Sequence, residues 1–285
     1  MSQKVQIVRT IIELRQQVAN WRAAGHRIGL VPTMGALHEG HLSLVKAIAG
    51  KADKIVVSIF VNPAQFGAGE DLESYPRREQ EDCVKLDETP ASLVFAPSVT
   101  EMYPNGHTTR ITLDGISEIL EGAQRPGHFD GVATIVSKLL LQCQPDIAIF
   151  GEKDYQQLAV IRQFVRDLDI PVEIMGGTLI READGLAYSS RNGYLNSAER
   201  AIAGQFNRIL NALVLSVQAG TDIRQAEKTA TDALLAAGFA SVDYVSVVDP
   251  DILLPVDLLE APARVLAVAR IGSVRLLDNM AITVR

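Results

Sequence analysis

Two histidines stand three residues apart in a glycine-bearing segment near the start of the chain, PTMGALHEGH over residues 32–41. Gly35 and Gly40 permit a ligand to approach the backbone closely, and a helix predicted to begin at Glu39 would offer free N–H groups. At that helix start, His38 and His41 can donate hydrogen bonds to phosphate oxygens and stabilise developing charge. The segment favours a phosphate site about as strongly as it favours two surface or capping histidines.

Other phosphate and metal motifs do not fit. The zincin pattern needs two histidines four apart, whereas His38 and His41 are three apart with a glycine between them. No further histidine or cysteine cluster is present in the sequence to complete a zinc shell. The Walker A pattern and the G-x-G-x-x-G fingerprint are also missing from the sequence, which disfavours a P-loop NTPase and an NAD-type enzyme.

Two further polar segments follow predicted strands. Asn62 and Gln65, in FVNPAQFG over residues 60–67, carry neutral donors and acceptors suited to a small polar substrate. Lys153, in FGEKDYQQ over residues 150–157, could be a counter-charge for phosphate, with Gln157 one turn further. Taken alone, the first segment is more simply an Asn-Pro turn, and the second is equally well a solvated turn without a ligand.

Alternating strands and helices must position these segments in the first part of the chain. Thr10 and Glu13 form a capping-box pattern at the start of the first helix, which Gly25 would end. This rhythm predicts a doubly wound, mainly parallel Rossmann-like sheet, whose ligands gather beyond the carboxyl ends of the strands. The predicted strands are 28–31, 54–61, 92–95, 147–150 and 172–175, and the further helices are 39–49, 77–88, 132–142 and 155–167.

The pattern changes after Gly176-Gly177, where a polar stretch precedes two long helices and then a run of strands. We expect helices at 197–218 and 222–237 and strands at 242–248, 264–271 and 274–277. This order predicts a separate, smaller α+β domain. We therefore divide the chain into residues 1–176, which would bind the ligands, and residues 177–285, which would form a C-terminal lid.

Composition limits the class of protein. The 285 residues are 47% hydrophobic and 21% charged, with 27 Lys and Arg against 34 Asp and Glu, so the formal net charge is 27 − 34 = −7. An acidic chain without a basic footprint predicts no nucleic-acid partner. No signal peptide or long apolar span is evident, and Cys83 and Cys143 show no disulfide or metal spacing. We expect a soluble cytoplasmic protein without a membrane partner.

Six segments together resemble the pantothenate synthetase family. They lie in the family's order over about 160 residues: PTMGALHEGH at 32–41, FVNPAQF at 60–66, YPR at 75–77, EGAQRPGHF at 121–129, FGEKDYQQ at 150–157 and READGLAYSSRN at 181–192. The chain is also similar to the wider H-x-G-H nucleotidylyltransferase superfamily. Two positions depart from the pattern: Tyr188 stands where Met or Leu is expected, and Ala64 stands where Met is usual.

The resemblance implies a ligase that uses ATP and Mg²⁺ to join pantoate to β-alanine through a pantoyl adenylate, as a homodimer. His41, His38, Lys153 and Arg191 would assist the chemistry. Asp82 would help to hold the metal. Gln65, Gln157, Asn62, Arg125 and His128 would bind pantoate and β-alanine. ATP would contact Pro32, Met34, Gly35, His38, His41, Gly151, Lys153, Asp154, Ile180, Tyr188, Ser189, Ser190 and Arg191.

Three other interpretations compete with this one. A class I aminoacyl-tRNA synthetase also uses H-x-G-H, but it needs an anticodon-reading domain and basic surface. Another small-molecule nucleotidylyltransferase of the superfamily is the runner-up, although it would not need Asn62, Gln65 and Gln157 as a carboxylate and diol cradle. A non-catalytic nucleotide-binding protein predicts loss of His38, His41 or Lys153, yet all three are present.

Overall fold

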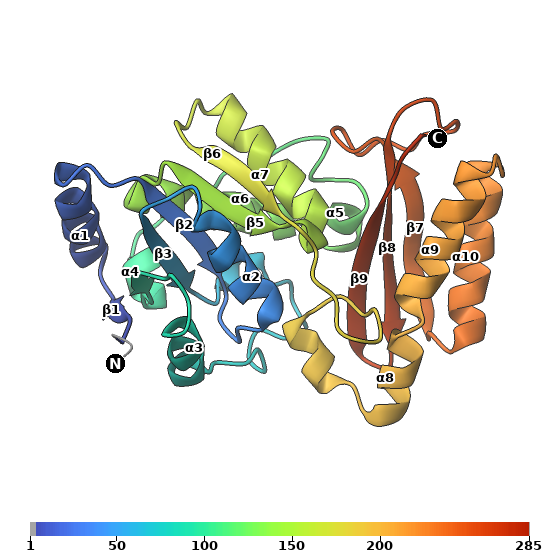
Figure 1. The fold of residues 1–285 in the computed structure, drawn as a ribbon, viewed down its shortest axis with the longest axis horizontal. Helices are drawn as coiled ribbons and strands as arrows, with labels where there is room; N and C mark the ends of the chain where they lie inside the picture. Colours follow the sequence, from blue (N-terminus) through green and yellow to red (C-terminus); the bar gives the residue numbers. More distant parts are fainter. Residues whose placement is uncertain (1–3, 285) are drawn as a thin grey trace. The chain divides into compact units, whose positions relative to one another are not determined.

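The computed structural model describes residues 4–284, and these form two compact units (Figure 1). The first unit comprises the chain up to Glu152 together with Val160–Thr178. The second comprises Lys153–Ala159 together with the chain from Leu179 onward. The short segment at 153–159 therefore belongs with the C-terminal part, although it lies between two stretches of the first unit.

Six parallel strands form the sheet of the first unit, in the order β1-β4-β3-β2-β5-β6. From β2 the chain adds β3 and β4 on one side and β5 and β6 on the other. The strand order therefore reverses between β2 and β5, and the loops that leave these two strands border the crevice where such sheets bind ligands. The strands are β1 Gln6–Val8, β2 Ile28–Thr33, β3 Lys54–Ile59, β4 Leu93–Phe95, β5 Ile147–Gly151 and β6 Glu173–Gly177.

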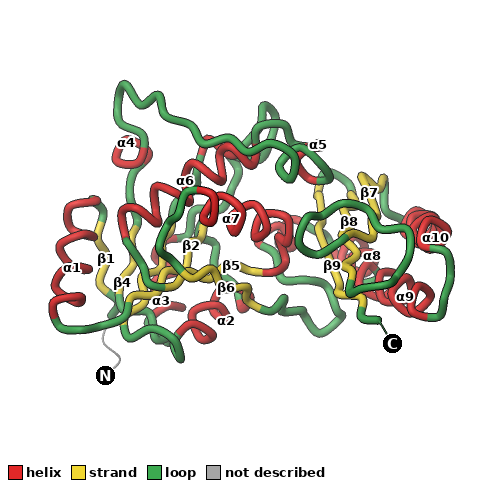
Figure 2. The backbone as a smooth tube through the Cα atoms, turned by 90° about the horizontal axis from the view of Figure 1, so that it is seen from above, coloured by secondary structure: helices red, strands yellow, loops and turns green. Residues whose placement is uncertain are grey.

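Helices cover both faces of this sheet (Figure 2), which explains why β3 and β5 each have four consecutive buried residues, most of them apolar. Helix α2 and helix α3 pack on one face, where Leu42, Val45 and Leu86 share a core with β2, β3 and β5. Helices α1 and α6 contact each other and β2 on the opposite face. The helices of the unit are α1 Ile11–Ala23, α2 Glu39–Ile48, α3 Glu79–Leu86, α4 Val99–Met102, α5 Glu121–Gln124, α6 His128–Cys143 and most of α7 Tyr155–Asp167.

The second unit is an antiparallel sheet with helices against it. Strands pair in the order β7-β8-β9, and helices α9 and α10 pack on each other and on the sheet. Phe206, Leu210, Leu234 and Val265 are buried together in its core. The elements are α8 Ser197–Ala203, α9 Phe206–Gln218, α10 Ile223–Ala237, β7 Ser241–Val248, β8 Ala263–Ile271 and β9 Val274–Ile282.

The predicted fold class is confirmed, because a mainly parallel α/β sheet is followed by a smaller α+β part. The predicted capping box is also present, with Thr10 and Glu13 each bonding the other's backbone. One prediction is wrong: residues 197–218 do not form a single helix, since α8 ends at Ala203 and α9 begins at Phe206. Gly204 weakens the helix there, and the Gln205 N–H bonds the Ile202 carbonyl in a tighter turn.

Two boundaries and one strand also differ from the predictions. Helix α6 begins at His128 rather than 132, because Gly127 supplies a left-handed residue directly before it. Strand β9 continues to Ile282 rather than 277. Strand β1, at the edge of the sheet, was not predicted, since three residues carry too little periodicity.

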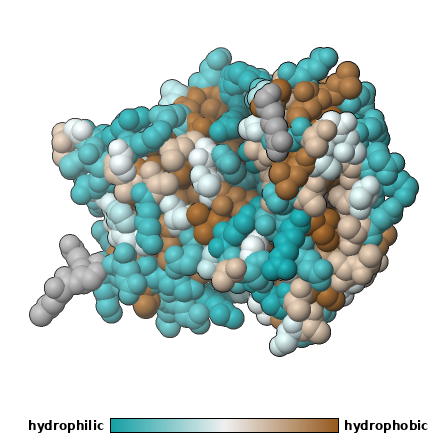
Figure 3. Space-filling view, turned by 45° about the vertical axis from the view of Figure 1, so that its right-hand side comes forward, coloured by the Kyte–Doolittle hydropathy of each residue, from teal (hydrophilic) through white to brown (hydrophobic). Residues whose placement is uncertain are grey.

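The polarity of the surface and the length of the helices are relevant to whether the protein could span a membrane. The face drawn in Figure 3 mixes polar and apolar areas, and polar residues interrupt the apolar ones. Over residues 4–284, no helix combines the length and apolar character needed to cross a membrane. Both cysteines are free thiols; Cys143 is buried, and burial raises its pKa to about 12.

Candidate active site

A buried carboxylate shapes the loop between β2 and α2, which carries both histidines. Asp82 accepts hydrogen bonds from the backbone N–H groups of Ala36, at 2.8 Å, and Leu37, at 2.7 Å. Gly35 and Ala36 both have positive φ, and a Cβ on Gly35 would lie 3.1 Å from Asp82 Oδ2. The glycine is therefore required for this loop to close on the carboxylate.

Burial raises the pKa of Asp82, although the two N–H groups and nearby Lys85 act in the opposite direction. Each carboxylate oxygen already accepts one backbone N–H. Among the residues that the structure describes, no group of three or more His, Cys, Asp or Glu side chains could hold a metal ion. The metal role of Asp82 stays a prediction.

The two histidines of the loop lie against each other. Their ring centroids are 4.0 Å apart, and the His38 backbone N–H donates to His41 Nδ1 at 3.3 Å. Because Nδ1 of His41 is the acceptor, the hydrogen of the neutral ring is assigned to Nε2. His41 therefore holds its Nε2–H as a donor, fixed in orientation by the backbone at the start of α2.

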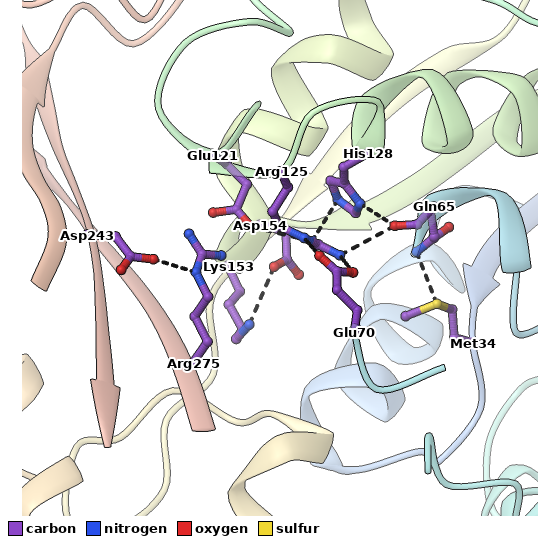
Figure 4. Close-up of polar contacts among 10 residues, drawn as sticks. All are labelled: Met34, Gln65, Glu70, Glu121, Arg125, His128, Lys153, Asp154, Asp243 and Arg275. Atoms are coloured by element: carbon purple, nitrogen blue, oxygen red, sulfur yellow. Dashed lines mark hydrogen bonds and ion pairs between the residues drawn. The ribbon is translucent and has the colours of Figure 1, made fainter. Parts of the chain in front are cut away.

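Four side chains form a set of hydrogen bonds that we call the Gln65 network: Met34, Asn62, Gln65 and Tyr103. Asn62 Nδ2 donates to Gln65 Oε1, at 3.0 Å, and to the Gly131 carbonyl, at 3.1 Å. Asn62 Oδ1 accepts from the Tyr103 hydroxyl, at 2.7 Å, and from the Ala64 N–H, at 3.3 Å. Gln65 Nε2 in turn points at Met34 Sδ, 3.1 Å away (Figure 4). Asn62 and Gln65 are both buried.

A second set of contacts holds the backbone of Gln65. His128 Nδ1 lies 2.8 Å from the Gln65 carbonyl oxygen, and its Nε2 lies 3.1 Å from Arg125 Nη1 (Figure 4). Arg125 also makes two short bonds to the Glu70 carboxylate, at 2.7 and 2.6 Å. An arginine only donates, so His128 Nε2 accepts and Nδ1–H donates to Gln65. Burial, helped by Arg125, lowers the pKa of His128 to about 4, so the ring is neutral.

A close backbone contact completes this region. The 3₁₀ turn η1, Pro63–Gln65, rests on α6 at Gly131, where an added Cβ would lie 2.2 Å from the Ala64 carbonyl oxygen. Only a residue without a Cβ allows the two backbones to approach so closely. Ala64 itself is exposed.

In the second unit, Lys153 follows the end of β5 by two residues and is half-buried. Its Nζ lies 3.4 Å from Asp154 Oδ1 (Figure 4). Its carbonyl accepts from Asn279 Nδ2 at 2.9 Å. Tyr155 has the Arg264 guanidinium 3.9 Å from its ring centroid. Strand residues of the second unit thus hold the backbone of this lysine in place.

The segment after Leu179 is a tight hairpin that we call the Arg181 hairpin, residues 180–188. Tyr188 N–H bonds the Ile180 carbonyl, and Glu182 N–H bonds the Leu186 carbonyl. Arg181 makes two bonds to the buried carboxylate of Asp278, at 2.7 and 2.8 Å. Arg200 joins Glu182 and Asp184 at 2.8 and 2.9 Å.

The hairpin leads directly into a short 3₁₀ helix, η3 Ser190–Tyr194. Ser189 caps this helix, because its side-chain oxygen accepts from the Arg191 N–H at 3.3 Å. Ser189, Ser190 and Arg191 thus lie together at the start of η3.

Most residues predicted for the first unit lie in one connected set of contacts. Bonds from Asp82, Gln65 and Asn62 tie the histidine loop, η1 and α6 together. Gly151 ends β5 in the first unit. The other predicted residues belong to the second unit: Lys153, Asp154, Gln157, Ile180, Tyr188, Ser189, Ser190 and Arg191. The sequence analysis missed Glu70 and Tyr103. Neither has a spacing signal, because each partner is more than 40 residues away.

Known proteins share this fold and sequence over the whole chain. The family described as pantoate-beta-alanine ligase matches residues 6–281. A pantothenate synthetase of Paramagnetospirillum magneticum is 54% identical over 282 residues, covering 99% of each chain. That of Caulobacter vibrioides is 51% identical over 279 residues, covering 97% of this chain and 98% of its own.

Two similar solved structures carry the same names. The crystal structure of pantothenate synthetase from Thermus thermophilus has a TM-score of 0.93 and 44% identity, covering 98% of this chain and 100% of that one. A pantoate-beta-alanine ligase from Francisella tularensis, complexed with beta-gamma ATP and beta-alanine, has a TM-score of 0.82 and 35% identity and covers 97% of each chain.

Proposed function

The chain belongs to the pantoate-β-alanine ligase family, and we propose that it joins pantoate to β-alanine through an ATP-derived pantoyl adenylate. Family membership makes it a ligase of pantothenate biosynthesis. The observation that carries the proposal is similarity to pantothenate synthetases along 99% of the chain. Such a match disfavours another nucleotidylyltransferase of the superfamily. The relative solved with beta-gamma ATP and beta-alanine supports ATP as the activating substrate.

In the first step, the pantoate carboxylate attacks the α-phosphorus of ATP, and pyrophosphate leaves. A carboxylate is already a nucleophile, so the protein must supply alignment and charge stabilisation rather than a nucleophile. His41 is the proposed donor to the departing pyrophosphate, with His38 beside it. Its Nδ1 is held by the His38 N–H, which supports a role for the Nε2–H as an oriented donor. Lys153 and Arg191 are the proposed cationic donors.

We assign the pantoate cradle to neutral amides. Gln65 and Gln157 would bind the acid and its hydroxyl groups, while Asn62, Arg125 and His128 would lie near pantoate and β-alanine. Gln65, Gln157 and Asn62 carry neutral amides, so they place no charge beside a carboxylate that must itself act as a nucleophile. The bonds of Asn62, Arg125 and His128 to protein groups support an indirect contribution, since all three hold Gln65 or its neighbours.

In the second step, the β-alanine amine attacks the activated carbonyl and releases AMP with pantothenate. The mixed anhydride hydrolyses readily, so water must be excluded. We propose that residues 177–285 act as a lid over the ATP and pantoate site of residues 1–176. The hairpin and η3 would then bring Ile180, Tyr188, Ser189, Ser190 and Arg191 to ATP, which Pro32, Met34, Gly35, Gly151 and Asp154 would also contact.

Magnesium fits this site only as a companion of the nucleotide. The described residues offer no cluster of three protein ligands, which agrees with an ion held mainly by phosphate oxygens. Asp82 would be the protein carboxylate nearest to that role, sharing oxygens that already accept backbone N–H groups. When bound, Mg²⁺ would neutralise phosphate charge. We also propose a homodimer and a cytoplasmic location.

Pyrophosphate release from MgATP tests the proposal. With (R)-pantoate but without β-alanine, we expect a burst of pyrophosphate close to one per active site. Adding β-alanine should convert the burst into steady formation of AMP and pantothenate. Pyrophosphate release that does not depend on pantoate, from folded protein, would contradict the adenylate mechanism. Pyrophosphate release that requires both pantoate and β-alanine would contradict the proposed order, in which the adenylate forms before β-alanine reacts.

A further inference from the structure

Tyr103 is a candidate for a role in substrate binding that the six sequence motifs do not include. It follows helix α4, is half-buried, and donates its hydroxyl hydrogen to Asn62 Oδ1 at 2.7 Å. This is the shortest hydrogen bond in the Gln65 network. Burial raises the pKa of Tyr103 to about 12, so the group remains a neutral donor throughout the physiological range.

The amide of Asn62 has no capacity left for another partner of either kind. Its two N–H donors go to Gln65 and Gly131, and its oxygen accepts from Tyr103 and the Ala64 N–H. If the amide were reversed, its NH₂ group would face the Ala64 N–H, which can only donate, and its oxygen would face the Gly131 carbonyl, which can only accept. These two backbone groups therefore turn the Asn62 NH₂ group toward Gln65, and the Tyr103 hydroxyl anchors the oxygen of the amide in that orientation.

The orientation of the Asn62 amide fixes the orientation of the Gln65 side-chain amide. Since Gln65 Oε1 accepts from Asn62, its NH₂ group must face the other way, where it meets the weak acceptor Met34 Sδ. A buried NH₂ group that meets only a weak acceptor in the protein suits a ligand that accepts hydrogen bonds. A carboxylate with hydroxyl groups, such as pantoate, is such a ligand.

We propose that Tyr103 is a positioning residue for pantoate, which acts through Asn62 to hold Gln65 with its NH₂ group toward the substrate. The inference rests on the proposed function, because it takes Gln65 as a pantoate ligand. It adds Tyr103 to the proposed pantoate site and gives the direction of each hydrogen bond. The tyrosine O–H donates to the asparagine oxygen, the asparagine N–H donates to the glutamine oxygen, and the glutamine N–H donates to the substrate.

The surroundings of Tyr103 provide a matched control. Its ring lines a cavity of about 750 Å³ within the first unit, together with His107, whose exposed ring meets it edge-on at 5.0 Å. His107 lies beside Tyr103 but makes no bond to any member of the Gln65 network among the described contacts. His107→Ala therefore disturbs the same wall and leaves the chain of hydrogen bonds intact.

A double-mutant cycle between Tyr103→Phe and Gln65→Ala tests the inference by steady-state kinetics. The phenylalanine keeps the ring and removes only the hydroxyl. We expect Tyr103→Phe to raise the KM for pantoate about 3- to 10-fold, the scale of one lost hydrogen bond, with kcat and the KM values for ATP and β-alanine within about 2-fold. In the Gln65→Ala background the same change should shift the pantoate KM by less than about 2-fold.

Other outcomes would overturn the inference. An equal effect of Tyr103→Phe in both backgrounds would mean that Tyr103 acts independently of Gln65. A matching rise in the pantoate KM for His107→Ala would assign the effect to the cavity wall. An unchanged pantoate KM in Tyr103→Phe would show that Tyr103 does not position Gln65 for pantoate. Failure of the proposed function is distinguishable, because it would appear in the unmodified protein as pyrophosphate release that is independent of pantoate.

Discussion

The Gln65 network and the Arg181 hairpin hold predicted site residues in opposite ways. In the first, neutral amides and a phenol set the orientation of a buried glutamine. In the second, ion pairs from Arg181 and Arg200 close a hairpin that leads to Ser189. A network of neutral groups can discriminate donor from acceptor without imposing charge on a nucleophilic carboxylate. Ion pairs stabilise a loop, but loss of one partner leaves the other charge buried and lowers the free energy of unfolding.

The largest effect is expected from breaking the buried ion pair of the hairpin. Arg181→Met leaves the Asp278 carboxylate, which has no exposed side-chain surface, without its partner. We expect the free energy of unfolding of the second unit to fall by about 3–5 kcal/mol. Hydrogen exchange of β9 and far-UV circular dichroism in urea measure this. Fluorescence of Trp21, the only tryptophan, reports the first unit and should change little.

A control variant separates charge burial from lost packing. Arg181→Met combined with Asp278→Leu removes both charges, and we expect it to recover at least half of the lost stability. If the double variant is as unstable as Arg181→Met alone, the cost comes from packing or from the other bonds of Arg181, and the contrast between the two regions weakens.

The next largest effect concerns one proposed hydrogen-bond donor from each unit. We expect His41→Ala and Lys153→Ala each to lower the rate of pantoate-dependent pyrophosphate release by at least about 10²-fold, the scale of one oriented donor in a transition state. Single-turnover kinetics at saturating substrates measures this rate. A near-normal rate in either variant would remove that residue from the proposed chemistry and leave the donor role to one unit.

A smaller effect follows from the neutral state of His128. Its pKa is lowered from 6.5 to about 4 in the folded chain, so between these values the unfolded chain binds more protons than the folded one. Stability contributed by the neutral ring is present above pH 6.5 and is lost as the pH falls toward 4. The upper limit of the change is about 3.4 kcal/mol, since one pKa unit corresponds to about 1.36 kcal/mol.

Urea unfolding followed by Trp21 fluorescence between pH 4 and pH 7 measures this dependence. His128→Phe should flatten the slope over this interval, because the titrating group is gone, while other groups keep their contributions. A slope that is equally steep in the variant would show that other groups cause the pH dependence.

The smallest effect is expected from the outer ion pairs of the hairpin. Arg200 and its partners Glu182 and Asp184 are all about one-third exposed. We expect Arg200→Gln to lower the stability of the second unit by at most about 1 kcal/mol, and less at high salt. Hydrogen exchange of β9 at two salt concentrations checks this. A loss as large as that of Arg181→Met would mean that burial does not distinguish the two pairs.

Sequence patterns predicted the fold well where local rules decide it. Buried parallel strands are mainly apolar, and the Thr10 capping box marks the start of α1, so the main strands and helices were found. The break at Gly204 was missed because one glycine weakens a helix without always ending it. Gly204 lies against Asp184, where an added Cβ would come within 3.1 Å of the carboxylate, and no local window of sequence contains both residues.

Residue types indicated which side chains could form a candidate site, but not what each side chain contacts. Asn62 and Gln65 were singled out as neutral polar groups, but their types do not reveal that Tyr103 and Gly131 bond the Asn62 amide. Asp82 was singled out for a metal, and its observed contacts are with the backbone of the histidine loop. A sequence gives donor and acceptor capacity, while the partners depend on tertiary structure.

The backbone contact between η1 and Gly131 has a consequence for how the chain can vary over evolution. Any side chain at position 131 would push the turn away from α6 and carry the Asn62 amide with it. The side chain at position 64 takes no part in this contact, because the backbone of that residue makes it and the side chain is exposed. We therefore expect that only glycine is tolerated at position 131, whereas position 64, where this chain has alanine, can accept side chains of several sizes.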